Sequence, residues 1–229
     1  QFDQDVLGYL SGFKQSALHG ASDTVNATVN GSVAVSTAAT NELLATMLVD
    51  ANDFNGGTAG NSIVAVPRAG GDGLNTTTAK ASPLSIIARM SRKLDQQNVD
   101  TSGRWLVIDP VFAELLQDED SRLMNADFGG AGLQNGLILN NVHGFKVYMS
   151  NNLPAVGNGA TGATATGSTH YGVIVGGHSS AVATADSINK TETYRDPDSF
   201  ADIVRGMHMY GRKILRPEAL SRAYYVSGY

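Results

Sequence analysis

An ordered run of two helices around one apolar strand constrains the fold more than any other feature of the chain. Apolar residues recur at helical spacing over residues 82–97, which begin with a Ser and a Pro that suit an N-cap and a first helical position. A polar turn at 98–103 leads to a short buried strand, Arg104–Ile108, and Asp109 can cap a second helix over 110–117. Helices interleaved with strands predict a mixed α+β fold.

Other elements follow from hydrophobic periodicity and turn residues. The chain opens inside an amphipathic pattern at Phe2, which predicts a helix to about His19 and residues that precede this segment. Gly, Ala and Thr dominate residues 157–168, which are expected to form a surface loop. The remaining expected elements are a hairpin over 24–35, a helix over 41–50, strands at 62–67, 143–150 and 171–175, a short helix at 178–184, and strands at 187–194, 201–213 and 219–226.

The composition excludes several classes of protein. The 229 residues include no cysteine, so no disulfide and no Cys-based metal site is expected. No apolar run approaches the roughly 18 residues of a transmembrane helix, so no membrane partner is predicted. The net charge of −5 argues against a nucleic-acid-binding footprint. Only 16% of the residues are charged, which fits a protein covered by copies of itself and fits a β-rich secreted domain almost as well.

No pattern in the sequence assembles a catalytic, cofactor-binding or metal-binding site. Gly, His and Ser occur close together at residues 176–180, but the Gly-x-Ser-x-Gly of a hydrolase nucleophile elbow is missing. A glycine turn that caps a short helix with Ser explains this segment better. The five histidines show no H-x-x-x-H spacing and have no Cys partners. We therefore predict no catalytic residue, no cofactor and no metal ligand.

Basic and aromatic residues are interleaved in the last third of the chain. This combination can bind single-stranded nucleic acid. Tyr and Arg are also enriched at protein–protein interfaces, and the chain as a whole is acidic, so we favour an interface. The residues predicted to make intersubunit contacts are Arg195, Asp196, Asp198, Arg205, Tyr210 and Arg212.

Four stretches, taken in their order along the chain, carry a resemblance to a known family. The first two are Phe-Asp-Gln-Asp-Val-Leu at 2–7 and the helix-strand unit at 84–110, which ends in Arg-Trp-Leu-Val-Ile-Asp-Pro. The others read Gly-Phe-Lys-Val-Tyr-Met-Ser-Asn-Asn-Leu-Pro at 144–154 and Gly-Met-His-Met-Tyr-Gly-Arg-Lys-Ile-Leu-Arg-Pro-Glu-Ala-Leu at 206–220. In this order and spacing they resemble the major capsid proteins of tailed bacteriophages with the Hong Kong 97-type fold.

The resemblance implies an α+β fold with a peripheral domain, made of a spine helix and long strands, and an axial domain. Residues 1–104 would then hold the end of the spine helix and parts of both domains. Residues 105–185 would form the axial domain, and residues 186–229 would return through the peripheral strands to it. The family's N-terminal arm and extended loop precede the spine helix, so they are expected to be absent from this chain.

The implied function is structural and not enzymatic. A major capsid protein self-assembles into an icosahedral shell that encloses double-stranded viral DNA. The implied partners are copies of itself in hexamers and pentamers, a scaffolding protein, a portal, a cement protein, and packaged DNA contacted without specific recognition. The protein would belong to the virion and assemble in the cytoplasm of a host bacterium. Two alternatives stay open: an encapsulin-like shell that encloses cargo enzymes, and a β-rich hydrolase or adhesin domain.

Overall fold

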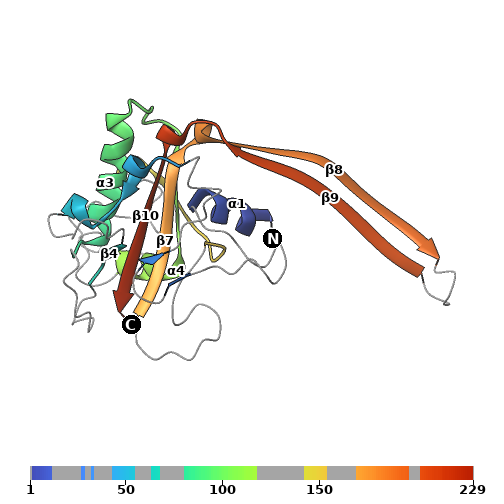
Figure 1. Cartoon of the computed structure of the whole chain (residues 1–229), viewed down its shortest axis with the longest axis horizontal. Helices are drawn as coiled ribbons and strands as arrows, with labels where there is room; N and C mark the ends of the chain where they lie inside the picture. Colours follow the sequence, from blue (N-terminus) through green and yellow to red (C-terminus); the bar gives the residue numbers. More distant parts are fainter. Residues whose placement is uncertain are drawn as a thin grey trace.

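The chain forms a body built on a mixed sheet, from which a long two-stranded arm projects (Figure 1). The computed structural model describes residues 2–11, 27–28, 32–33, 43–54, 63–67, 80–117, 142–153, 169–195 and 202–228. Within them, no helix is long and apolar enough to cross a lipid bilayer.

The last strand of the chain organises the body sheet. It pairs antiparallel with a strand from the middle of the chain and parallel with two short strands from its first third. The order across the sheet is β3 (Leu48–Val49), β10 (Leu220–Gly228), β7 (Thr169–His178), β5 (Arg104–Ile108) and β6 (Lys146–Met149), and β4 (Ile63–Ala65) also pairs with β10. Strands distant in sequence therefore lie side by side, and the sheet joins the first third of the chain to its last strand.

Two capped helices cover one face of the sheet. Helix α3 (Pro83–Gln96) begins after Ser82, whose side chain accepts a hydrogen bond from the Ser85 backbone N–H at 3.3 Å. Helix α4 (Pro110–Leu116) begins after Asp109, which accepts from the Phe112 backbone N–H at 3.3 Å. The apolar sides of both helices are buried against the sheet; they include Ile86, Ile87, Met90, Leu94, Phe112, Leu115 and Leu116.

Helix α1 (Phe2–Ser11) lies on the other face. The adjacent residues Tyr224 and Tyr225 of β10 point to opposite faces, as alternate positions of a strand must. The Tyr225 ring meets the Phe112 ring of α4 at 5.0 Å between centroids. The Tyr224 hydroxyl donates to the Ser11 carbonyl of α1 at 2.8 Å. Gly172 makes room for Tyr225, because a Cβ on Gly172 would lie 2.4 Å from the tyrosine ring.

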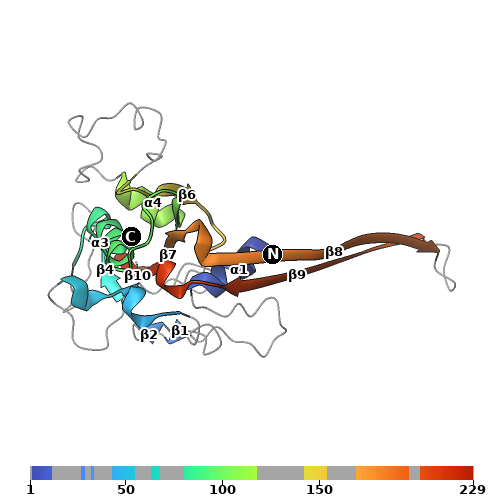
Figure 2. The same cartoon turned by 90° about the horizontal axis from the view of Figure 1, so that it is seen from above.

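The arm consists of β8 (Val182–Arg195) and β9 (Asp202–Ile214), paired antiparallel. Fourteen residues of β8 at roughly 3.3 Å each give an arm about 45 Å long. A β-bulge between Asp186 and Ile188 interrupts the register. Bulges bend and twist the strand that carries them, in keeping with the bent course of the arm in Figure 1. Seen from above, α1 lies beside the base of the arm (Figure 2).

Most of the elements expected from the sequence are confirmed. The hairpin expected over 24–35 has β1 (Ala27–Thr28) paired with β2 (Ser32–Val33). The helices at 82–97 and 110–117 and the strands at 62–67, 171–175, 187–194, 201–213 and 219–226 are present, with bounds that differ by a few residues. The opening helix is described from Phe2 to Ser11; its predicted extension to His19 and the loop at 157–168 lie outside the described residues.

Three expectations are wrong. No long helix forms at 41–50: a 3-10 turn, Ala45–Met47, leads into β3, because Leu48 and Val49 pair with β10. The helix expected at 178–184 is a single 3-10 turn, Ser179–Ala181, and β8 begins directly after it. The strand expected from residue 143 starts only at Lys146, because His143 and Gly144 have positive φ angles of 48° and 85° that form a turn.

Candidate assembly surface

The base of the arm is fixed to α1 by a cluster around one buried carboxylate. Asp5 is buried and forms an ion pair with Arg212 of β9. The Tyr210 hydroxyl donates to Asp5 Oδ2 at 3.3 Å, and the Arg212 guanidinium lies 4.8 Å from the centroid of the Tyr9 ring. Burial lowers the pKa of Arg212 below its usual value, yet a guanidinium stays protonated in proteins. The arm therefore leaves the body in a defined direction.

The pairing register divides the arm into two faces. Cross-strand partners share a face and successive residues alternate between faces. Tyr210 and Arg212, which contact α1, share their face with His208 and Val204; we call it the helix-side face. The opposite face carries Tyr194, Glu192, Arg205, Met207 and Met209, and we call it the methionine face.

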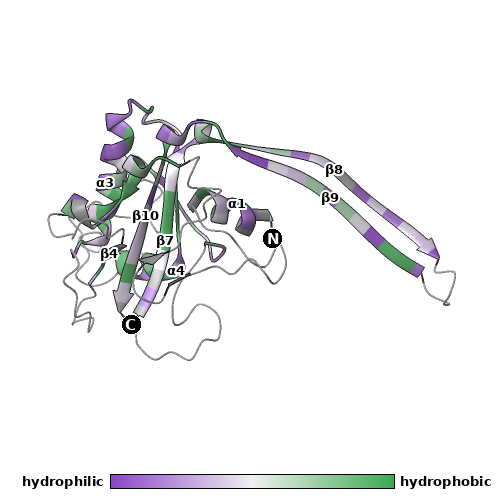
Figure 3. Ribbon diagram, viewed as in Figure 1, coloured by the Kyte–Doolittle hydropathy of each residue, from purple (hydrophilic) through white to green (hydrophobic). Residues whose placement is uncertain are grey.

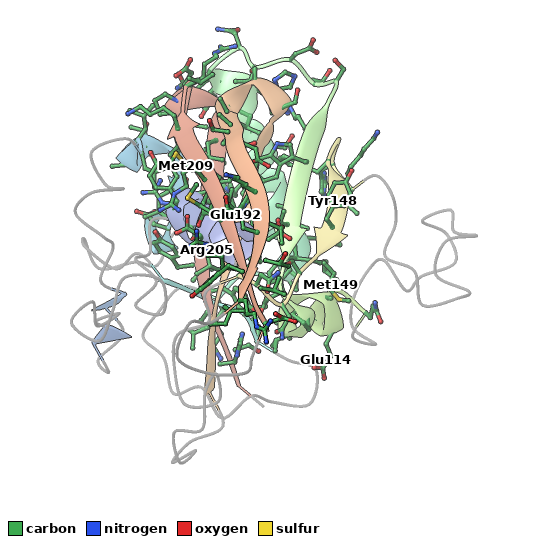
Figure 4. All side chains as sticks on the ribbon, turned by 90° about the vertical axis from the view of Figure 1, so that its right-hand side faces the viewer. Glu114, Tyr148, Met149, Glu192, Arg205 and Met209 are labelled. Carbon is green, nitrogen blue, oxygen red and sulfur yellow. The ribbon has the colours of Figure 1, made fainter. Side chains whose placement is uncertain are left out.

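The methionine face combines exposed apolar side chains with an ordered charge cluster. Arg205 donates to Glu192 Oε2 from Nη2 at 2.7 Å and from Nε at 3.2 Å, and its guanidinium lies 5.1 Å from the centroid of the Tyr194 ring. Lys190 forms a further ion pair with Glu192. The hydrogen bond from Lys190, followed by that from Arg205, lowers the pKa of Glu192. Figure 4 shows Glu192, Arg205 and Met209 on the arm.

The helix-side face is polar along most of its length. His208 Nε2 lies 2.9 Å from Asp186 Oδ1, and the His208 ring is tilted against the Tyr210 ring at 5.6 Å between centroids. Val204 is its exposed large apolar residue. Figure 3 shows hydrophilic and hydrophobic residues mixed along the arm, whereas the middle of β7 in the body is hydrophobic. The arm is thus two-sided, with its apolar side chains concentrated on the methionine face.

Exposed apolar side chains also lie on the body at β6, which is an edge strand of the described sheet. Tyr148 is 55% exposed and Met149 is 62% exposed. Edge strands with apolar side chains are exposed to pairing with other chains, so natural proteins usually cover or charge them.

The densest polar cluster in the body is buried. The Tyr225 hydroxyl donates to the carboxylate of Asp109 and lies 2.7 Å from Oδ1 and 2.6 Å from Oδ2. His170 Nε2 lies 2.8 Å from the same Oδ2. All three residues are less than 10% exposed. The cluster joins α4, β7 and β10 and offers no opening to a substrate, so its role is structural. Sequence reasoning identified Asp109 only as a helix cap.

The hydrolase alternative finds no support in this geometry. His178 Nδ1 lies 2.8 Å from Ser180 Oγ and accepts the Ser180 backbone N–H at 3.2 Å. The side chain of His178 therefore caps a 3-10 turn. The glycine turn and the serine cap expected at 176–180 are wrong, because Gly176 and Gly177 belong to β7. Among the residues that the structure describes, no group of three His, Cys, Asp or Glu side chains is placed to hold a metal ion.

Four of the six residues predicted at subunit contacts lie in the described part of the arm. Arg205 is on the methionine face, while Tyr210 and Arg212 contact Asp5 within the same chain. Arg195 ends β8 opposite Asp202. Asp196 and Asp198 lie outside the described residues. The structure has one chain, so the intersubunit role of all six stays a prediction.

Several of the basic and aromatic residues that could have indicated nucleic-acid binding are buried in the core. Arg222 is buried on β10 and donates to the Tyr224 hydroxyl at 3.1 Å. Tyr224 and Tyr225 are buried as well, where neither ring is available to stack on a base.

Comparison with known proteins agrees with a structural role. The sequence profile of a family described as "Phage capsid protein" matches residues 16–223. A structure from Mycobacterium phage Che8 is similar with a TM-score of 0.53 and 29% identity, over 81% of this chain and 57% of that one. The bacteriophage PhiM1 mature capsid is similar in fold, with a TM-score of 0.50 and 18% identity over 71% of this chain and 51% of that one. A search of curated proteins found no match.

The chain therefore spans little more than half the length of these structural relatives. Its mixed helix-and-sheet fold is shared with them, and the family profile covers nearly all of the sequence. The chain belongs to the phage capsid protein family.

Proposed function

We propose that this protein is the major capsid protein of a tailed bacteriophage, with the Hong Kong 97-type fold. It assembles with copies of itself into an icosahedral shell around double-stranded DNA. The observation that carries the proposal is the family match over residues 16–223, joined to an arm that projects well beyond the body. The same match supports a structural, non-enzymatic role.

The shape of the molecule supports this role physically. A compact body with one long projection makes contacts beyond its own perimeter, as a tile in a continuous shell must. In the proposed division, residues 105–185 form the axial domain, residues 1–104 add the end of the spine helix, and residues 186–229 return through the peripheral strands. The arm would be the peripheral part, and most of the mixed sheet the axial part. Arg195, Asp196, Asp198, Arg205, Tyr210 and Arg212 remain the proposed intersubunit residues.

The wider assembly follows from the family. Hexamers and pentamers of this chain would form around a scaffolding protein and a portal in the bacterial cytoplasm, with a cement protein as a further partner of the finished virion. The net charge of −5 suits a container whose inner face contacts DNA without binding it tightly. An encapsulin-like shell would use a similar subunit and differ in what it encloses.

The test is to produce the full-length protein with its scaffolding protein and image the products by electron microscopy. We expect closed shells of uniform diameter that elute in the void volume of a size-exclusion column. Nucleic acid in shells purified from infected cells identifies a virus capsid, whereas an enzyme cargo identifies an encapsulin. A protein that stays monomeric under every assembly condition would exclude both.

A further inference from the structure

The arm exposes several large apolar side chains to solvent, which is unfavourable for a two-stranded ribbon that nothing covers. Of the eight large apolar side chains exposed among the described residues, four lie on the arm, and three of these lie on the methionine face. Tyr194, Met207 and Met209 are 44%, 51% and 52% exposed. A two-stranded hairpin is at best marginally stable alone in water, so such an arm needs a covering layer.

The charges of the arm favour a protein as that layer. Residues 182–214 contain five Lys or Arg and five Asp or Glu, so the rest of the chain carries the whole net charge of −5. Two copies of the body repel each other, while a neutral arm does not add to that repulsion. Phosphate binding needs an excess of basic groups, and residues 182–214 as a whole have none.

The two faces differ in what already occupies them. The base of the helix-side face contacts α1 through Tyr210 and Arg212. The methionine face points away from that helix and includes Lys190, Arg205 and Lys213 against the single acid Glu192. A basic and apolar face complements an acidic body. Methionine side chains are flexible and adapt well to the shape of a partner.

From these observations we propose that the methionine face is covered by the body of a neighbouring copy of this chain. The proposal rests on the assembly function proposed above and adds to it the face that makes the contact. Met207, Met209 and Tyr194 form the apolar centre of the interface. The Glu192–Arg205 pair is already held by two hydrogen bonds within the arm. It therefore offers the neighbouring copy a charge cluster of fixed position, which sets how the two copies align.

The lack of cysteine in the chain allows a direct test, because one introduced thiol is unique. Met209→Cys places a thiol on the methionine face. Val204→Cys is the matched control, since Val204 is also an exposed apolar residue of β9, on the opposite face. Maleimide labelling rates are compared between dissociated subunits and assembled shells of the full-length protein.

We expect the Met209→Cys thiol to react about tenfold or more slowly in shells than in subunits, because it reacts only when the contact opens. The Val204→Cys thiol should react at nearly equal rates in both. Equal labelling rates for Met209→Cys in subunits and in shells would overturn the proposal. Protection found only in DNA-filled shells would also overturn it, because it would assign the face to nucleic acid. If Met209→Cys prevents assembly, Met207→Cys on the same face replaces it. Unmodified protein that forms no shells would refute the assembly function instead.

Discussion

The structure contains two Asp–His pairs with almost equal distances but different burial. We expect the loss of the aspartate to destabilise the protein strongly in the buried pair and hardly at all in the exposed pair. Asp109 and His170 lie 2.8 Å apart, with side chains 7% and 9% exposed. Asp186 and His208 lie 2.9 Å apart, with side chains 63% and 44% exposed. Because an exposed ion pair contributes roughly 0–1 kcal/mol, Asp186→Ala should change the free energy of unfolding by less than about 0.5 kcal/mol.

Asp109→Ala should be far more destabilising. It removes an N-cap worth about 1 kcal/mol, together with the hydrogen bonds that Asp109 accepts from Tyr225 and His170, of about 1.5–3 kcal/mol each, as is typical for charged partners. Such losses are not additive, so we expect a total of about 3–5 kcal/mol. At about 2–4 °C per kcal/mol for a domain of this size, the melting temperature should fall by about 10 °C. Tyr225→Phe, which removes only the hydroxyl, should cost about 1–2 kcal/mol.

The assay is thermal unfolding of dissociated subunits, followed by the fluorescence of Trp105. It is the only tryptophan of the chain and lies on β5, directly upstream of Asp109. We expect the difference between the two aspartates because Asp109 is buried and Asp186 is exposed. Equal melting temperatures for Asp109→Ala and Asp186→Ala would refute it.

Three further predictions concern the arm and the sheet. Asp5→Asn should loosen the arm at its base at a cost of about 1–3 kcal/mol, seen as faster amide hydrogen exchange at residues 209–214; unchanged exchange there would contradict the role of the ion pair. Gly172→Ala should cost about 1–3 kcal/mol by overpacking against Tyr225, and an unchanged denaturation midpoint would show that the ring moves aside freely. The pKa of Glu192 is depressed in the folded state. Its pairing therefore stabilises the fold at pH values above the ordinary glutamate pKa of about 4.3, and this stabilisation is lost as the pH falls through the depressed pKa. An NMR titration should find the Glu192 midpoint below that range and higher again in Lys190→Ala, whereas a midpoint at the ordinary value would disprove the pairing.

Much of the local structure could be predicted because its causes are local. A capping side chain followed by proline marks the starts of α3 and α4, and the alternation of residues 201–213 marks β9. Residues 41–50 show the limit of this reasoning. Their apolar spacing is helical, but Leu48 and Val49 pair with Arg222 and Ala223 at the far end of the chain, and this pairing overrides the local pattern.

The contacts that define the candidate surface had no local signal. Tyr210 contacts Asp5 across 205 residues, and Tyr225 contacts Asp109 across 116. A pattern within one strand predicts that its faces differ, but not which face the rest of the chain covers. Met149 shows the same limit, because the alternation of residues 143–150 predicts a strand but not that β6 lies at the edge of the sheet with Met149 exposed.

We propose that this chain works by packing against its own copies, with the projecting arm as a main contact. A cryo-electron microscopy reconstruction of the assembled particle, at a resolution that separates strands, would show what lies against each arm. We predict that density from a neighbouring subunit runs along the methionine face of every arm. Arms surrounded by solvent, or folded back onto their own bodies in a particle held together elsewhere, would contradict it.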